Sequence, residues 1–302
     1  MVGLIPSRSI SAPERIRRTV ALLARRGYAI SPQRLADLCL GGSISPDEVR
    51  WTAAASPDLN LVEDVVVDLT SLSRVGEIRS RAAGHGANAA TYVQMTRRFV
   101  RTLVEVAPFI RGVSIAGSLA SGGFREADDV DLNLIVDDGH RHLAYVAVNT
   151  LGLAHALAHR NKPVDDLTRR PLAPRLMTAN LILERSQCFP LVRQDEDMAF
   201  ELLMAEPLFG IEAIDELLAA NPALLEHFPQ LAAKQAALLL DTPVRRLPAA
   251  LFPRFLDGAA RMLGEAAWRY MQWTRRDSPD ALARVAYVRA TMRPYTLFDG
   301  RG

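Results

Sequence analysis

Residues 113–136 read VSIAGSLASGGFREADDVDLNLIV, and this stretch decides the fold and carries the chemistry. An apolar, β-branched run ends at Gly117-Ser118, a glycine-rich segment follows, and a second strand-like alternation begins near Asp129. Period-two alternation places Asp129 and Asp131 on one face of that second strand. Two neighbouring carboxylates repel each other and are costly to bury without a partner. A divalent metal would resolve the conflict, so the stretch predicts a metal site beside a turn that can hold a phosphate.

Composition describes a globular chain that is long enough for a sizeable core. The chain has 302 residues, 49% apolar and 23% charged, with a formal net charge of +2. This balance gives no global electrostatic reason to expect nucleic acid or a membrane as partner. The two cysteines, Cys39 and Cys188, make neither a disulfide framework nor a zinc set, which predicts a cytoplasmic location. No apolar run approaches about 18 residues and no secretory pattern is present, so we expect no membrane contact.

The first part of the chain predicts three helices and a hairpin. Helices are expected over 13–27, 32–42 and 46–56, because a proline stands at the start of each and glycines follow the first two. Two strand-like runs follow within 59–70. Three short helices and a β-ribbon form the outline of a winged-helix-like domain, to which we assign residues 1–72.

A DNA-binding role for this domain would place its third helix in the major groove. That helix carries Arg50 as its only base-reading cation, next to Asp47 and Glu48, and the ribbon is acidic. A phosphate footprint normally needs several cations on one face. The sequence therefore favours protein interaction or scaffolding for this domain, with DNA binding as the alternative.

The remaining chain predicts an α+β core followed by helices. The expected core elements are a connector helix over 88–107 after a polar stretch, strands over 112–116, 129–136 and 178–184, a short helix from Ser118, and a helix over 141–160. From about Asp195 onward the pattern is helical throughout, punctuated by proline and glycine. We assign residues 73–192 to the core, with its leading connector helix, and 193–302 to an all-α C-terminal domain.

At Gly117, Ser118, Asp129 and Asp131 the sequence resembles the nucleotidyltransferase superfamily, which has the fold of DNA polymerase beta. The superfamily pattern is an apolar strand, Gly-Ser, a spacer, and then carboxylate–apolar–carboxylate–apolar. The chain is also similar to bacterial nucleotidyltransferase-domain proteins that join a winged-helix-like unit, this core and a helical tail. Those similarities lie in the segments 178–184, 199–210 and 219–229. The resemblance implies a small mixed sheet with helices, flanked by the two other domains.

The resemblance also implies a reaction. The protein would transfer a nucleoside monophosphate from a nucleoside triphosphate to an acceptor, with Mg²⁺ or Mn²⁺ bound by Asp129 and Asp131. Gly117 would let the backbone approach the triphosphate, and Ser118 would offer a hydroxyl, together with amides of the following helix. The acceptor is a hydroxyl or phosphate on a small molecule, a protein or RNA. The alternative is a catalytically inactive nucleotide-binding or DNA-binding regulator.

Members of the superfamily usually carry a third carboxylate on the next core strand, and here that position is Asn180. Asparagine can bind a metal through its carbonyl oxygen but is a poor proton acceptor. Glu184 shares a face with Asn180, about 13 Å further along the strand, and is the candidate general base. Arg141 directly follows the second core strand, so we expect it near the mouth of the site, in contact with a phosphate or base.

Overall fold

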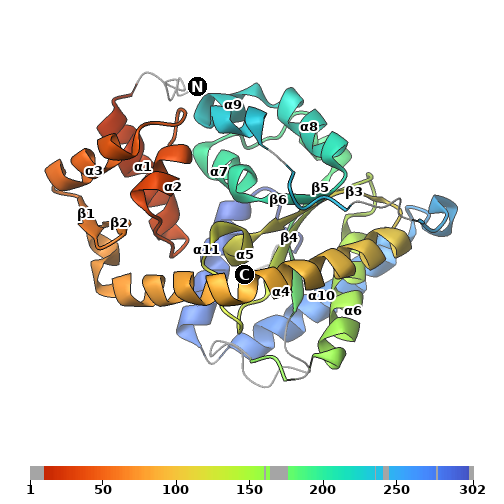
Figure 1. Ribbon diagram of the computed structural model, residues 1–302. Coiled ribbons are helices and arrows are strands. Elements are labelled where there is room, and N and C mark those ends of the chain that lie inside the picture. Colours follow the sequence, from red (N-terminus) through yellow and green to blue (C-terminus); the bar gives the residue numbers. More distant parts are fainter. Residues whose placement is uncertain are drawn as a thin grey trace.

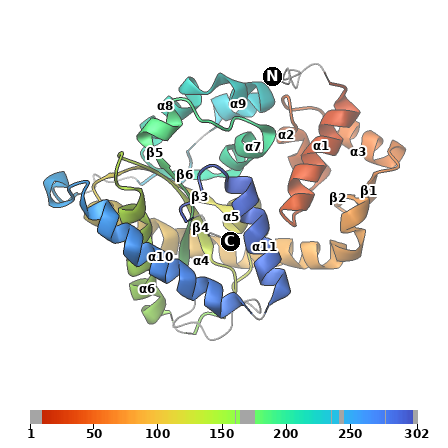
Figure 2. The ribbon, with the colours of Figure 1, turned by 180° about the vertical axis from the view of Figure 1, so that it is seen from behind.

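The computed structural model describes residues 10–159, 161–163, 176–234, 236–240, 245–276 and 278–298. Helices surround one small mixed sheet (Figures 1 and 2), which confirms the predicted α+β class. Over the residues described, no helix combines the length and the apolar character needed to cross a membrane.

The N-terminal unit contains the three predicted helices and the hairpin. Its elements are α1 (Ala12–Arg25), α2 (Pro32–Asp37), α3 (Pro46–Ala55), β1 (Leu59–Val62) and β2 (Val65–Asp68), and β1 pairs antiparallel with β2. Ser31 and Ser45 cap α2 and α3, because their hydroxyls accept hydrogen bonds from the amides of Arg34 and Glu48 at 3.3 and 3.1 Å. Serine followed by proline therefore starts these helices as the sequence predicts.

The core sheet has the strand order β5-β4-β3-β6. Its strands are β3 (Ile110–Ala116), β4 (Val130–Val136), β5 (Met177–Glu184) and β6 (Glu206–Phe209). β4 runs antiparallel to β3 and parallel to β5, and β6 adds antiparallel to the other side of β3. The three predicted strands are all present, with bounds shifted by one or two residues.

The two faces of the sheet belong to two different hydrophobic clusters. On one face, Ile115, Leu132 and Leu134 pack with α4 (Val75–Val106) and α6 (Arg141–Ala158). On the other face, Ile135 and Leu181 pack with α7 (Glu196–Met204), α8 (Ile211–Ala220) and α9 (Pro222–His227). Strand alternation thus directs Asp131 and Asn133 toward the side that α7 covers.

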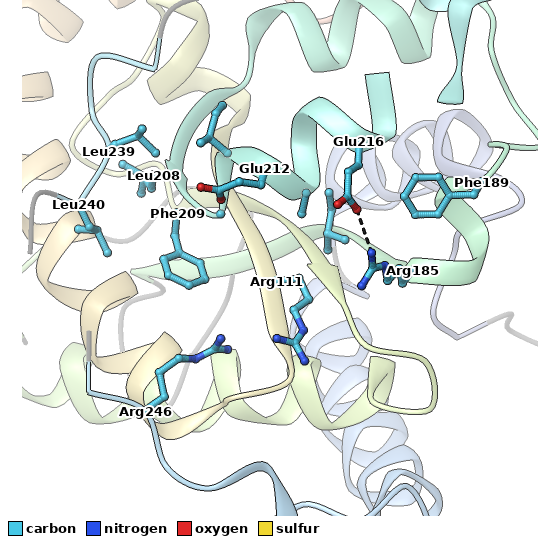
Figure 3. Close-up of a pocket in the computed structure, with 14 residues that line it drawn as sticks. Arg111, Arg185, Phe189, Leu208, Phe209, Glu212, Glu216, Leu239, Leu240 and Arg246 are labelled. Atoms are coloured by element: carbon cyan, nitrogen blue, oxygen red, sulfur yellow. Dashed lines mark hydrogen bonds and ion pairs between the residues drawn. The ribbon is translucent and has the colours of Figure 1, made fainter. Parts of the chain in front are cut away.

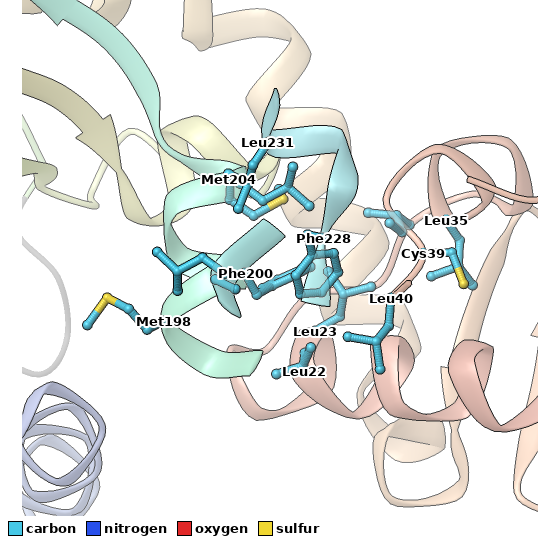
Figure 4. Close-up of a cluster of buried hydrophobic side chains, with 14 of the residues drawn as sticks. Leu22, Leu23, Leu35, Cys39, Leu40, Met198, Phe200, Met204, Phe228 and Leu231 are labelled. Atoms are coloured by element: carbon cyan, nitrogen blue, oxygen red, sulfur yellow. The ribbon is translucent and has the colours of Figure 1, made fainter. Parts of the chain in front are cut away.

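The second cluster also joins the N-terminal unit to the later helices. Figure 4 shows Leu22, Leu23 and Leu40 beside Phe200 of α7 and Phe228, and all five side chains are almost completely buried. Ion pairs reinforce this contact, between Arg18 and Glu196 and between Arg26 and Asp197, both acids being in α7. The first helix is therefore packed directly onto the helix that covers the sheet.

Two predictions about the helices and strands are wrong. The connector helix begins at Val75 instead of residue 88, because Val75 and Ile78 bury themselves against Val65 and Val67 of the hairpin, and this packing outweighs the glycines nearby. The chain after Asp195 is also not helical throughout, since β6 forms an edge strand of the core sheet. An edge position tolerates the proline of β6.

The remaining elements complete the chain order. They are the 3₁₀ turns η2 (Leu69–Arg74), η3 (Arg185–Cys188), η4 (Pro229–Ala233) and η5 (Ala249–Leu251), the short helix α5 (Gly117–Ser121), and the helices α10 (Leu256–Arg275) and α11 (Pro279–Met292). α10 packs along α6, on the same side of the sheet as α4 (Figure 2).

Candidate functional site

The Gly-Ser turn and Asp131 meet at one end of the sheet. β3 ends at Ala116, whose partner across the antiparallel ladder is Asp131, and α5 begins at the next residue. Gly117 has a φ of +61°, and a Cβ there would lie only 2.9 Å from Cγ of Asp131. Glycine alone combines this backbone conformation with such a close approach. The structure thus brings together the two residues that the sequence motif singles out.

A cavity of about 430 Å³ opens at this end of the sheet. Gly117, Asp131 and Asn180 line it, as do Glu201 and Asp197 of α7. Its other described walls come from the C-terminal end of α1, the start of α4, α5 and α11. The cavity therefore combines carboxylates of the sheet and α7 with side chains of the N-terminal unit.

Asn180 lies at a β-bulge in β5, where the register with β4 shifts. Leu132 pairs with Ala179 but Asn133 pairs with Leu181, so Asn180 is an extra residue in the ladder. Its amide nitrogen donates hydrogen bonds to Oδ1 of Asn133 at 2.9 Å and to Oε1 of Glu201 at 3.0 Å. Both bonds use the nitrogen, which leaves the carbonyl oxygen of Asn180 as its metal-binding atom.

Glu201 supplies a carboxylate that sequence reasoning missed. Its Oε1 also accepts a hydrogen bond from the amide nitrogen of Asn133 at 3.2 Å, so two asparagines hold one oxygen of the side chain. The only signal in the sequence is a lone acidic residue within the run AFELLM at 199–204. Strand alternation cannot reveal Glu201, because its position depends on how α7 packs over the sheet.

Asp131 lines the cavity together with side chains whose oxygen atoms are of the kind that could hold a hard divalent cation. Oδ1 of Asp131 accepts a hydrogen bond from Oγ1 of Thr178 at 3.0 Å. With Asn180 and Glu201, Asp131 offers the carboxylate and carbonyl oxygens that Mg²⁺ or Mn²⁺ binds alongside substrate phosphates and water. Within the part of the chain that the structure describes, no three His, Cys, Asp or Glu side chains gather into a metal-binding group.

The predicted roles of Asp129 and Ser118 stay predictions. Asp129 is half-buried just before β4, and neither residue is among the described ones that line the cavity. Ser118 and Ser121, both in α5, are 5% and 6% exposed, and of the two Ser121 is among the described lining residues. The neighbouring Asp128 is a buried partner of Arg81 at 3.3 Å, which makes it structural.

The predicted roles of Glu184 and Arg141 in the site are wrong. Across the β4–β5 ladder Thr178 pairs with Asp131 but Glu184 pairs with Val136, so Glu184 lies about 20 Å along the strand from the site. Glu184 accepts a hydrogen bond from the Gly139 amide at 2.7 Å and caps η3. Arg141 donates to the carbonyl oxygens of Ile182 and Tyr295, beyond the far end of β4. Asp131 lies near the start of β4, whereas Arg141 follows the end of β4 and Glu184 pairs with its last residue, so the length of the strand separates both from the site.

Lys234 fixes the end of the helix that carries Glu201. Its ammonium donates hydrogen bonds to the carbonyl oxygens of Leu202 at 3.0 Å, Leu203 at 2.6 Å and Ala205. A cation is favourable at this position because it satisfies the last carbonyls of α7. Burial lowers the pKa of Lys234 to about 8, while the charges of Glu206 and Glu201 oppose this shift.

A second cavity, of about 460 Å³, lies at the other end of β3, over β6 and the start of α8 (Figure 3). Its arginines are already engaged. Arg111 pairs with Asp137 at 2.6 Å, Arg185 pairs with Glu216 at 3.0 Å, and Arg246 donates to the carbonyls of Pro108 and Ile110. None of the residues predicted for the site is among its described lining residues. We therefore place the candidate site in the first cavity.

Neither the known protein-family models nor the curated proteins include one that matches this chain.

Proposed function

We propose that the protein is a Mg²⁺-dependent nucleotidyltransferase that moves a nucleoside monophosphate from a nucleoside triphosphate to an acceptor hydroxyl or phosphate. The observation that carries the proposal is the close approach of Gly117 to Asp131 in a cavity that Glu201 also lines. The turn between antiparallel β3 and β4, and the parallel neighbour β5, support the resemblance drawn from the sequence.

The proposed reaction requires positioning and charge stabilisation. An acceptor oxygen attacks the α-phosphorus, the bond to the pyrophosphate leaving group breaks, and negative charge gathers on the phosphoryl oxygens. Asp131 and Asn180 would hold Mg²⁺, which, when bound, supplies electrostatic stabilisation of that charge. The backbone at Gly117 approaches the phosphates because no side chain intervenes.

Glu201 takes the proton of the acceptor in this proposal. Asn180 and Asn133 hold its Oε1 by hydrogen bonds at 3.0 and 3.2 Å, so Oε2 is the atom that receives the proton. This assignment replaces Glu184, whose carboxylate caps η3 at the far end of β5. Glu201 thus provides a carboxylate in place of the one that the resemblance leads us to expect at position 180, where this chain has asparagine.

Label transfer tests the proposal. The purified protein is incubated with Mg²⁺, a cell extract as the source of acceptors, and each nucleoside triphosphate labelled at either the α- or the γ-phosphate. We expect the α-label to become attached to an acceptor and the γ-label to leave in pyrophosphate. Transfer of the γ-label would instead indicate a kinase, and absence of labelled product with every nucleotide would contradict transferase activity.

One observation favours a second function, nucleotide binding without transfer. Asn180 stands where the resemblance expects a third carboxylate, and a carbonyl oxygen cannot act as a base. Such a protein would bind nucleotide with Mg²⁺ through Asp131, yet transfer neither label. The label experiment, paired with a binding measurement, separates the two functions.

A further inference from the structure

Four arginines of the N-terminal region line the candidate site. Arg25 ends α1 and Arg26 follows it, Arg74 ends η2, and Arg81 lies about two turns into α4. We refer to these four residues as the arginine wall. A net charge of only +2 for the whole chain makes their concentration at one cavity a local feature of the fold.

Arg26 is held within the protein and supports the packing of α1 on α7. Its side chain is only 16% exposed, pairs with Asp197 at 3.2 Å and lies over the ring of Phe200. Arg81 is 8% exposed and divides its hydrogen bonds between Asp128 and the carbonyl of Gly123, at 3.3 Å each.

Arg25 and Arg74 are far more accessible. Their side chains are 47% and 52% exposed, and each has one ion pair at 3.3 Å, with Asp197 and Glu77 respectively. A guanidinium carries five N–H donors in a planar fork, so one such pair leaves most of its donor capacity for a ligand.

Two guanidinium groups converge at Gly27. A Cβ built at this glycine would lie 3.8 Å from Nη2 of Arg74 and 3.9 Å from Nη1 of Arg81. These are not the nitrogens that form the ion pairs described above, which use Nε of Arg74 and Nη2 of Arg81. With φ at +75°, Gly27 ends α1 and leaves room between the two cations. Adjacent cations repel each other, and an anion between them would relieve the repulsion.

We infer that Arg25, Arg74 and Arg81 bind a phosphate group of a ligand that occupies this cavity. Planar guanidinium groups match phosphate oxygens with paired, charge-assisted hydrogen bonds. The phosphate belongs either to the tail of the nucleoside triphosphate or to a phosphorylated acceptor. This inference rests on the proposed function for the identity of the ligand, and it makes the N-terminal unit a part of the substrate site.

Anion binding without metal tests the arginine wall by itself. Binding of inorganic tripolyphosphate is measured by calorimetry in EDTA, for the wild type and for the double variant Arg25→Gln/Arg74→Gln. The control is Arg17→Gln/Arg79→Gln, which removes the same charge from α1 and α4 at exposed arginines paired with Glu14 and Glu63 outside the cavity. We expect at least tenfold weaker binding in the first variant and unchanged binding in the control.

A second arm distinguishes the two sources of phosphate. Binding of inorganic phosphate is measured while Mg²⁺ and the α,β-methylene analogue of ATP saturate the nucleotide site. A loss of affinity in the tripolyphosphate arm assigns the arginine wall to the triphosphate tail, and a loss confined to this second arm assigns it to a phosphorylated acceptor. Equal affinities of the wild type and the double variant in both arms, or no binding by the wild type in either, would overturn the inference.

The experiments distinguish a failure of the proposed function from a failure of this inference. If Asp131→Asn leaves Mg²⁺-dependent nucleotide binding intact while the double variant loses anion binding, the metal assignment is wrong and the arginine wall stands. The opposite pattern would reject the arginine wall and retain the metal site.

Discussion

Gly117 and Asp131 define the site at the scale of single residues. Their contact requires a left-handed backbone and the absence of a Cβ, because Cβ, Cγ and Oδ2 of Asp131 surround the position that a side chain would take. A substitution at either residue is therefore expected to change the geometry of the site more than it changes the fold. The same scale includes Glu201, whose orientation depends on hydrogen bonds from Asn180 and Asn133.

Replacing Gly117 by alanine tests whether activity depends on the close approach of Gly117 to Asp131 or only on an unstrained backbone at this position. We expect G117A to lower transfer activity by about 100-fold, because the new methyl group displaces Asp131 from its position. G122A is the matched control: Gly122 also has a left-handed φ, +88°, but a Cβ there would meet only Nη1 of Arg34, at 3.5 Å. Both variants should lose about 1–2 kcal/mol of stability in urea unfolding. Equal activity losses in the two variants would show that strain alone explains the effect.

Glu201→Gln tests the proposed proton acceptor. Glutamine keeps an oxygen that Asn180 and Asn133 can reach, so folding should be preserved while the base is lost. We predict a fall in transfer rate of about 100-fold or more, with nucleotide affinity nearly unchanged. Glu226→Gln, at an exposed side chain of α9 outside the described lining of the cavity, serves as control. Full activity of E201Q would remove Glu201 from the mechanism.

At the scale of elements, a carboxylate of α10 holds the start of α6. Asp257 accepts hydrogen bonds from the amides of His142 and Leu143 at 2.8 Å and from Nδ1 of His142 at 2.7 Å. Burial raises the pKa of Asp257, but these hydrogen bonds outweigh it and leave the pKa below its ordinary value of 3.8. The ionised form is therefore the one that the fold stabilises.

Asp257→Ala should lower the free energy of unfolding by about 1–3 kcal/mol at neutral pH, because three donors lose their acceptor. A depressed pKa contributes stability that is complete above pH 3.8 and disappears as the pH falls through the folded-state value. The difference between wild type and D257A should thus stay constant at higher pH and shrink below 3.8. Urea titrations across this range measure it. A difference that persists undiminished in acid would contradict the assignment.

The elements could be predicted wherever local rules decide them. Prolines near the helix starts predicted the N-terminal helices, and period-two alternation predicted β3, β4 and β5. The start of α4 and the edge strand β6 could not be found this way, since each depends on packing with a distant segment. The same division applies to the site. Asp131 lies on β4 and Gly117 directly follows β3, so both follow from the sequence motif, and the resemblance pointed to Asn180 on β5. Glu201 and the arginine wall instead reach the cavity through tertiary packing.

At the scale of the whole molecule, the N-terminal unit, α7 and α9 share one hydrophobic cluster. Leu23, which is 1% exposed, contributes to that cluster from α1. Since the same α1–α7 contact brings Arg25 and Arg26 to the cavity, stability and the proposed phosphate binding would depend on one interface. The protein should therefore unfold without first releasing the N-terminal unit.

Leu23→Ala tests this cooperativity. We expect a loss of about 2–5 kcal/mol, as for other buried leucines, and a single unfolding transition that moves as a whole. Leu61→Ala, at a side chain that is 41% exposed, should change stability little. Trp51 lies in α3 of the N-terminal unit and Trp268 lies in α10, so tryptophan fluorescence reports on both parts of the molecule. If they unfold together, circular dichroism and fluorescence should give the same unfolding midpoint. Two separate transitions would indicate an N-terminal unit that unfolds independently.

In the proposed function, Asp131 anchors a metal-bound nucleoside triphosphate in the cavity at the end of β3. Calorimetric titration with ATP, in Mg²⁺ and in EDTA, tests it most directly. The comparison uses the wild type, Asp131→Asn, and Asp137→Asn as a charge-matched change at the other end of β4, where Asp137 pairs with Arg111. We predict that Mg²⁺ tightens ATP binding at least tenfold in the wild type and in D137N but not in D131N. Binding that is independent of Mg²⁺, or equally Mg²⁺-dependent in D131N, would contradict the account.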